Sequence, residues 1–290
     1  MATGATEFID STTADSFIPE NWSPYTLVAR ENAMVWADLV DRKYEENLKY
    51  GDVIHVNPVS NLTAQTKTKA SNAAVTYETV TETAVDISIA TWGYHALAVE
   101  TIVTAQAYKD QLELYAPKQG YALGLQIDDV LAGLPDDLSS TTAVGTLAQE
   151  FTDDDWLLAR QRLDDADVPQ DGRFSVVSPK AEAGLLKLDR MVHQDYTVLH
   201  GGKASAARDR AYITSFIDVP IYKSVNVEGT NAAGHDCFMG HKSCFALVIQ
   251  TKPKAWRQFD IDYLCHKVVV EQLFGTKEMR EDHGIYMKGP

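Results

Sequence analysis

The segment from Thr63 to Ile89 constrains the fold most, because it is long, polar and unable to build a core of its own. It reads TAQTKTKASNAAVTYETVTETAVDISI; seven of its 27 residues are Thr, and it contains no glycine. From Val75 onward, apolar and polar residues alternate as in a strand. The preceding run KYGDVIHVNPV (49–59) also predicts a strand. Together they predict a long β-hairpin from residue 49 to 89 with a polar tip near residues 60–75.

Such a hairpin needs a neighbouring surface. An isolated two-stranded hairpin is marginal in water. In the predicted return strand, Tyr77 and Ile87 fall on one face, with Glu78 and Asp86 on the other. We therefore expect the apolar face to lie on another part of the protein or on another copy of it.

The rest of the chain is long and apolar enough to form a substantial core. It has 290 residues, of which 45% are hydrophobic, which suits one large domain or two modest ones. Its net charge is −15, and Lys and Arg form no cluster. A protein that holds nucleic acid through its phosphates needs a basic face. The composition therefore argues against direct nucleic-acid binding.

The expected compartment is reducing, and no membrane is expected as a partner. Three cysteines are too few, and odd in number, for a disulfide framework. The N-terminal residues have no basic region followed by an apolar stretch, so they do not predict a signal peptide. No apolar run approaches the roughly 20 residues that span a bilayer. These features predict synthesis in the cytoplasm.

Helix signals are clearest in the middle of the chain. One or two short helices are expected within residues 25–48. An apolar stripe in YALGLQIDDVLAGL (121–134) predicts a long helix that Pro135 ends, with Pro117 kinking it or starting its later part. Thr152 is the expected N-cap of the next helix, with three Asp residues in its first turn.

Strand signals dominate the second half. GRFSVVSP (172–179) predicts a buried strand, after which Ser178 caps a helix that begins at Pro179. Residues 216–227 and 237–240 each predict a strand. The last segment, 264–287, predicts two strands around a turn near Gly275.

The order of these parts resembles the major capsid protein of tailed bacteriophages, whose fold is named for phage Hong Kong ninety-seven. The resemblance covers nearly the whole chain and lies in the order of segments and in loose local patterns. The segments that carry it are FIPENWSPYTLVAREN (17–32), KYGDVIHVNPVSN (49–61), YETVTETAVDISI (77–89), YALGLQIDDVLAGL (121–134), GRFSVVSPKAEAGLL (172–186), IDVPIYKSVNV (217–227) and CFMGHKSCFALVIQ (237–250).

The resemblance implies an α+β fold with an N-terminal arm, an extended β-hairpin loop, a peripheral domain with a long spine helix and an axial domain. The spine-helix region corresponds to residues 97–134. The expected boundaries are 1–48 for the arm, 49–92 for the extended loop, 93–180 for the peripheral domain, 181–262 for the axial domain and 263–290 for C-terminal strands that return to the peripheral domain.

It also implies a structural function without catalysis or cofactor. Copies of the chain would assemble into pentamers and hexamers of an icosahedral head that encloses double-stranded DNA without binding it specifically. A scaffolding protein and a portal are expected partners, and a decoration protein is a possible one. No acidic helical prefix precedes the arm, so the scaffold is expected to be a separate protein. The expected location is the virion. A nanocompartment shell of the same fold, enclosing a protein cargo, is the alternative.

Five residues are candidates for contacts between subunits. Trp22 and Trp92 flank the arm and the hairpin and are expected either at subunit contacts or in the ordinary core. Tyr77 lies on the apolar face of the hairpin. Lys67 and Lys69 lie in the loop, where some relatives cross-link a lysine to a late asparagine of a neighbour. The last asparagine here is Asn231, so no late partner is evident.

One cluster suggests a different function. His235, Cys237, His241 and Cys244 are all zinc-ligand types, and a metal-dependent hydrolase using the first three is the enzyme alternative. Their spacing matches no common zinc module, and residues along one strand cannot all point inward. The two cysteines are as readily explained as small core residues. Separately, Asp128 lies near the apolar helix stripe, where a structural salt bridge is expected.

Overall fold

The fold is described from a computed structural model of the chain. Residues 32–290 form one compact unit. The described residues are 31–32, 34–47, 50–57, 62–69, 74–75, 77–79, 84–106, 111–139, 141–188, 212–216 and 219–290.

The described N-terminal elements are short. α1 (Trp36–Leu39) and the 3-10 helix η2 (Lys43–Asn47) confirm the short helices predicted there. β1 (Val53–Val56) then pairs antiparallel with β2 (Val85–Ser88). The predicted hairpin is therefore present at its base. The predicted return strand from Tyr77 is wrong in length, because regular pairing begins only at Val85.

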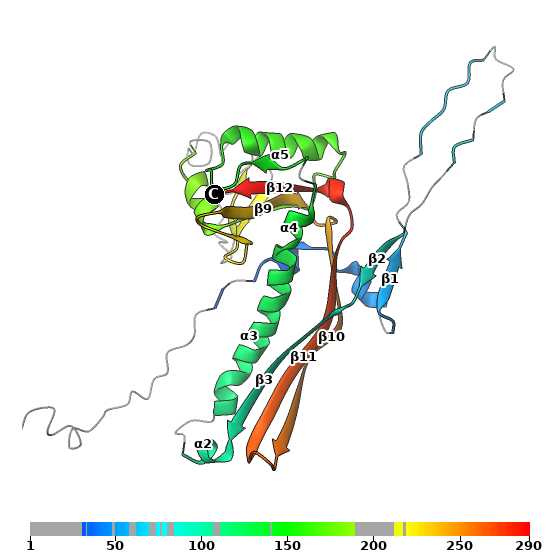
Figure 1. Cartoon of the computed structure of the whole chain (residues 1–290). Helices are drawn as coiled ribbons and strands as arrows, with labels where there is room; N and C mark the ends of the chain where they lie inside the picture. Colours follow the sequence, from blue (N-terminus) through cyan, green and yellow to red (C-terminus); the bar gives the residue numbers. More distant parts are fainter. Residues whose placement is uncertain are drawn as a thin grey trace, which may run out of the picture. The chain divides into compact units, whose positions relative to one another are not determined.

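A three-stranded antiparallel sheet is covered on one face by the long helix. Its order is β10 (Phe245–Asp260), β11 (Cys265–Glu278) and β3 (Thr91–Glu100). α2 (Thr101–Gln106) follows β3, and α3 (Gln111–Ala132) runs along the sheet (Figure 1).

The contact between α3 and the sheet is close. A Cβ at Gly93 would overlap the side-chain oxygen of Gln126. The Gln272 amide donates to the backbone oxygen of Leu123 at 2.8 Å. Any other residue at position 93 would force the Gln126 side chain to move away from β3. The long helix predicted around residues 121–134 is confirmed, and it extends upstream through Pro117.

A second, seven-stranded sheet combines segments that are distant in sequence. β12 (Gly284–Gly289) and β9 (Gly234–His241) lie at its centre beside β5 (Arg173–Val177). β5 runs parallel to β7 and antiparallel to β9, so the sheet is mixed. The strand order is β4 (Val144–Gly145), β12, β9, β5, β7 (Val219–Lys223) and β6 (Tyr212–Phe216), with β8 (Gly229–Thr230) paired to β9.

Three helices accompany this sheet, and their ends match local sequence signals. In α5 (Asp153–Asp165), Thr152 and Asp155 form a capping box. In α6 (Pro179–Leu185), the Ser178 hydroxyl accepts from Ala181 N at 3.1 Å. Both predicted caps are confirmed. Gly133 alone separates α3 from α4 (Leu134–Asp137). Pro135 lies inside α4, so the prediction that it ends the long helix is wrong, because α3 already ends at Ala132. η3 (Glu281–His283) precedes β12.

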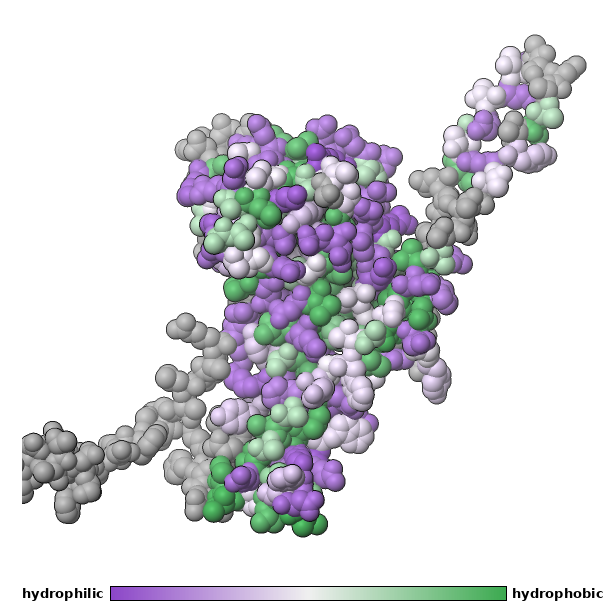
Figure 2. All heavy atoms as spheres, viewed as in Figure 1, coloured by the Kyte–Doolittle hydropathy of each residue, from purple (hydrophilic) through white to green (hydrophobic). Residues whose placement is uncertain are grey.

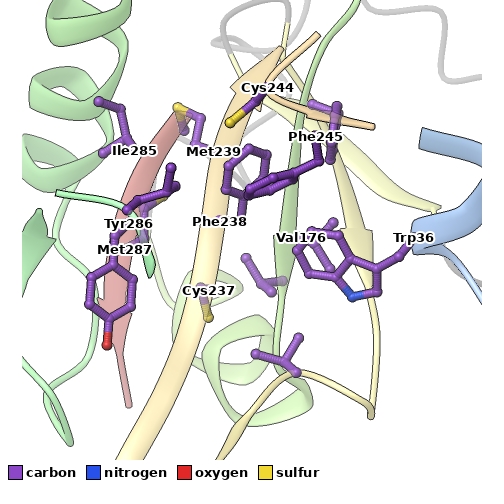
Figure 3. Close-up of a cluster of buried hydrophobic side chains, with 14 of the residues drawn as sticks. Trp36, Val176, Cys237, Phe238, Met239, Cys244, Phe245, Ile285, Tyr286 and Met287 are labelled. Atoms are coloured by element: carbon purple, nitrogen blue, oxygen red, sulfur yellow. The ribbon is translucent and has the colours of Figure 1, made fainter. Parts of the chain in front are cut away.

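The main core is centred on aromatic rings of this second sheet. The Phe238 ring centroid lies 4.9 Å from that of Phe245, 5.3 Å from that of Phe174 and 5.9 Å from that of Trp36. Figure 3 shows Trp36 reaching this cluster from a separate segment of the chain. All four side chains are buried. Because Phe245 begins β10, the core also holds the start of the three-stranded sheet.

Asp128 organises the junction between α1 and α3, although not through the predicted salt bridge. It is fully buried and accepts hydrogen bonds from the backbone N–H groups of Val35 at 2.9 Å and Trp36 at 2.8 Å. Asn226 Nδ2 donates to its second oxygen at 2.7 Å. Among the described residues it forms no salt bridge, and these hydrogen bonds satisfy both of its oxygens instead.

The turn predicted near Gly275 is also wrong. β11 continues through Gly275, and the chain turns at residues 279–283 instead. A Cβ at Gly275 would clash with the backbone oxygen of Ser88. The missing side chain at Gly275 therefore lets the backbone of β2 pack closely against β11. The strand predicted for 216–227 is present as β7 over residues 219–223, and Phe216 ends β6, which pairs antiparallel with β7.

Residues 263–290, predicted to return to the peripheral domain, contribute one strand to each of the two sheets. β11 lies at the centre of the three-stranded sheet, whereas β12 pairs with β9 and β4 in the seven-stranded sheet. Among the described residues, none of the helices has the length and apolar character needed to span a bilayer.

Candidate assembly surfaces

The loop between β1 and β2, residues 57–84, exposes nearly everything described in it. Residues 62–69 are all exposed, including Lys67 and Lys69, and Tyr77 is 87% exposed. The backbone N–H of Thr63 donates to Glu78 Oε2 at 2.9 Å, so the outgoing and returning parts of the loop meet there. The loop thus folds back on itself as a hairpin would, with its side chains unburied.

The base of this loop is fixed to the body. Ile87 and Ile89 are buried against Ala246 and Val248 in a small core of their own. The Ile89 N–H also donates to Asp52 O at 2.8 Å. The loop therefore starts from a rigid base and loses its packing beyond β1 and β2.

The three-stranded sheet carries an exposed aromatic face opposite α3. Along β3 the residues alternate between a covered and an exposed side, and Trp92 and Tyr94 lie on the exposed one. Trp256 on β10 is 52% exposed, and Trp92 is 69% exposed. We define the aromatic face as Trp92, Tyr94, Lys254, Trp256 and Glu271.

Glu271 holds the two indoles of the aromatic face in place. Its Oε2 accepts from Trp92 Nε1 at 3.1 Å, and its Oε1 accepts from Trp256 Nε1 at 2.7 Å. Lys254 Nζ lies 4.0 Å from the Trp256 ring centroid, a cation–π contact. The aromatic rings are thus oriented before anything binds to them, which reduces the entropy lost on binding.

A second exposed apolar surface lies where β10 turns into β11, beside α2. The backbone N–H of Thr101 donates to Leu264 O at 3.0 Å and joins the two segments. In Figure 2, apolar side chains gather at this end of the three-stranded sheet. We define the apolar tip as Ile102, Val103, Phe259, Ile261, Tyr263 and Leu264, all exposed.

Such surfaces are unusual on a protein that acts alone. Single exposed apolar residues are common, but contiguous patches mark sites of association. Tryptophan and tyrosine are enriched at protein interfaces because they combine a large apolar area with a hydrogen-bonding group. The aromatic face and the apolar tip are therefore the candidate assembly surfaces.

The predicted contact residues divide between the loop and the sheet. Lys67, Lys69 and Tyr77 lie in the exposed loop, and Trp92 lies on the aromatic face. Trp22 lies outside the described residues. The contacts of all five with another subunit stay predictions.

Sequence reasoning missed most of the aromatic face. Trp256, Tyr94 and Glu271 lie in no sequence pattern that marks them as interface residues. The alternation along 91–100 was a usable signal, but the side covered by α3 was not known. By contrast, Trp36 and Trp156 are buried in the main core.

The candidate metal ligands do not come together. Figure 3 shows the sulfur atoms of Cys237 and Cys244 well apart, with Phe238 between them. His235 Nε2 lies 3.0 Å from Asn231 Oδ1, and His241 Nε2 lies 2.9 Å from Asp171 O. No group of three potential ligands with metal-binding geometry occurs within the described part of the chain.

Burial also affects the two thiols. Burial raises the pKa of Cys237 to about 12 and raises that of Cys244 well above its usual value. Metals bind the thiolate, and these thiols are neutral near pH 7. Both cysteines fill space in the core instead.

The fold is that of solved phage capsid structures. A structure from Mycobacterium phage Che8 superposes with a TM-score of 0.75 and 23% identity, covering 93% of this chain and 97% of that one. The capsid structure of cyanophage P-SCSP1u gives 0.74 and 15%, covering 96% and 94%. The mature capsid of bacteriophage PhiM1 gives 0.63 and 14%, covering 93% and 90%.

These similarities confirm the predicted fold class. The matches extend over nearly the full length of both partners, so they concern the whole architecture and not one shared motif. No family model matches the chain, and no curated protein does.

Proposed function

We propose that this chain is the structural subunit of an icosahedral viral head, in which copies assemble as pentamers and hexamers. The observation that carries the proposal is the similarity to phage capsid structures over more than nine tenths of the chain. The exposed surfaces add a physical reason, since the aromatic face and the apolar tip are costly for a monomer to leave in water.

In the proposed assembly, the loop of one subunit lies on the aromatic face of the next. The loop offers Thr hydroxyls and Tyr77, while the face offers oriented indoles and a carboxylate. Each hydrogen bond formed contributes about 1 kcal/mol net. The contact is heterologous, because the loop of one subunit binds a different surface, the aromatic face, on the next. Repeating such a contact around an axis generates a ring.

The apolar tip forms a second contact in this proposal. It lies at the end of the three-stranded sheet, away from the loop base at Ile87 and Ile89. Its apolar side chains would be buried against copies in a neighbouring ring, which joins rings into a shell. Burying them contributes about 25 cal/mol per Å² of apolar surface.

The domain assignment is likewise part of the proposal. The three-stranded sheet with α3 would be the peripheral domain, the seven-stranded sheet the axial domain, and residues 1–48 the arm. β12 would then belong to the axial domain, because it pairs with β9.

The proposed head encloses double-stranded DNA without binding it specifically. A net charge of −15 opposes tight contact with phosphates and keeps the interior wall from trapping DNA. A scaffolding protein and a portal are proposed partners, with a decoration protein as a further one. The subunit would reside in the virion after synthesis in the host cytoplasm, and it would have no catalytic role.

Electron microscopy of the purified full-length chain tests the proposal. We expect closed shells built of pentamers and hexamers. A chain that remains monomeric, alone and with a co-expressed scaffold, would overturn it. Shells that contain a protein cargo and no nucleic acid when isolated from their native source would favour the nanocompartment alternative, and stoichiometric zinc by elemental analysis would favour the hydrolase.

A further inference from the structure

We propose that His241, Ser243 and His283 form a pH-sensitive latch between the two chain segments that join β9 to β10 and β11 to β12. The latch is a property of the single subunit and does not depend on the proposed function.

The latch lies where the chain crosses twice between the two sheets. The first crossing, residues 242–244, connects β9 to β10, and the second, residues 279–283, connects β11 to β12. The crossings are bonded to each other, because Met279 N donates to Cys244 O at 2.8 Å. A change in the latch therefore acts on the connection between the sheets.

One serine hydroxyl links the two imidazoles. Ser243 Oγ lies 2.7 Å from His241 Nδ1 and 2.6 Å from His283 Nδ1. The two rings meet edge to face, with centroids 5.9 Å apart. The first crossing thus contacts the second through side chains as well as through the backbone.

The surrounding partners fix the tautomer of His241. Its Nε2 lies 2.9 Å from the carbonyl oxygen of Asp171, which can only accept, so Nε2 carries the proton. Its Nδ1 then accepts from the backbone N–H of Ser243 at 3.2 Å and from the Ser243 hydroxyl. The hydroxyl oxygen is left to accept from His283 Nδ1–H.

Protonation of His241 breaks this arrangement. A proton on Nδ1 would point at the Ser243 N–H, a second donor, and remove its acceptor. The Ser243 hydroxyl would then lie between two N–H donors. It could accept from both only by losing the hydrogen bond that it donates to His241 Nδ1. The geometry therefore favours a neutral His241. His283 keeps its Nδ1–H bond to Ser243 in either protonation state, so only burial and neighbouring charges oppose its second proton.

The charges around the latch act in the same direction. Burial lowers the pKa of His241, and Lys242 and Arg173 lower it further against the opposing bond and charge of Asp171. Burial, Arg280 and His241 lower the pKa of His283 against the opposing charge of Asp282. Arg173 is paired with Asp164 at 2.7 Å, and Glu278 and Glu281 lie near Cys244 on the second crossing.

The sign of the pH effect follows. Because both pKa values are lower in the closed latch than the usual value of about 6.5, the open state binds more protons at acid pH. The closed latch is fully stable above about pH 6.5 and loses stability as the pH falls below it. At pH 5.5, opening increases by up to about ten-fold for each histidine.

Hydrogen exchange of the full chain tests the latch. At pH 7.5 and 5.5, exchange is measured at the amides of Ser243, Cys244 and Met279 and corrected for the intrinsic rate, with β5 amides as internal reference. We expect protection of the latch amides to fall several-fold to about a hundred-fold at pH 5.5, since two histidines contribute. Unchanged protection would overturn the proposal.

A matched double variant isolates the two imidazoles. H241Q places an amide donor toward Asp171 O, and H283N places an amide donor toward Ser243 Oγ. The double variant can therefore form uncharged hydrogen bonds at both places, and neither amide titrates. It should lose the pH dependence, whereas H55Q, which removes an exposed imidazole on β1, should keep it. Full pH dependence in the double variant would contradict the latch.

A direct titration covers the case in which the double variant does not fold. The pKa values of His241 and His283 in the wild-type chain, followed by NMR of ¹³C-labelled imidazoles, should both lie below 6.5. Values at or above 6.5 for both would overturn the proposal.

Discussion

The seven-stranded sheet and the outer half of the three-stranded sheet are both built of strands, yet they differ in what covers them. All five residues of β5 are buried. In β10, by contrast, the eight residues from Lys252 to Phe259 are all exposed. The strands of the first region are covered by their own chain. In the second region, α3 covers one face of β3 and β11, and both faces of β10 are exposed from Lys252 to Phe259.

This difference separates folding from association. Burial of large side chains such as Phe238 stabilises the subunit in isolation. The aromatic face contributes little to that stability because it is already exposed to water. Burying the aromatic face contributes free energy only when another surface covers it. We therefore expect changes in the core to lower subunit stability and changes in the aromatic face to impair assembly.

The largest loss of subunit stability is expected from F238A. Phe238 is fully buried and touches three other aromatic side chains. Its truncation leaves a cavity and should lower the free energy of unfolding by about 3–5 kcal/mol in urea titrations. A loss below about 1 kcal/mol would mean that this cluster is not the centre of the core.

The second largest loss of subunit stability is expected from D128A. It leaves the buried N–H groups of Val35 and Trp36, and the partly buried amide of Asn226, without their acceptor. We expect a loss of about 3 kcal/mol in the same titration. D128N is the matched control, because it keeps one acceptor oxygen and should lose less; an equal loss in both would assign the effect to the charge.

The Asp128 contacts illustrate which features a sequence can predict. Thr152 and Ser178 act on residues three positions away, so their caps were predictable from local signals. The partners of Asp128 lie more than 90 residues away in both directions. Nothing local to residue 128 distinguishes a carboxylate that binds backbone amides from one that forms a salt bridge.

Gly275 and Trp256 show the same limit. Gly275 has the local character of a turn, but its function is to let β2 pass, which depends on a strand nearly 190 residues earlier. Trp256 resembles any core tryptophan until the side covered by α3 is known. The order of elements was predictable because each has its own periodicity, whereas the surfaces follow from how the elements pack.

T152A should have a moderate effect. The Thr152 hydroxyl accepts from Asp155 N at 3.3 Å at the start of α5. Its loss should lower the free energy of unfolding by about 1 kcal/mol. T146A, at an exposed position in the preceding loop, is the control and should change stability by less than about 0.5 kcal/mol.

W256A should have the smallest effect on the isolated subunit and a large one on assembly. Its ring is half exposed and gains one hydrogen bond, to Glu271, and one cation–π contact. We expect a loss of about 1 kcal/mol or less in unfolding, together with loss of shells in sedimentation. Normal shells from W256A would remove the aromatic face from the assembly account.

Deletion of residues 60–75 tests most directly whether the subunit is completed by its neighbours. The account predicts a chain with the circular dichroism and melting temperature of the intact subunit that sediments as a monomer and forms no shells. Intact shells from the deletion variant, or a variant that fails to fold, would contradict it.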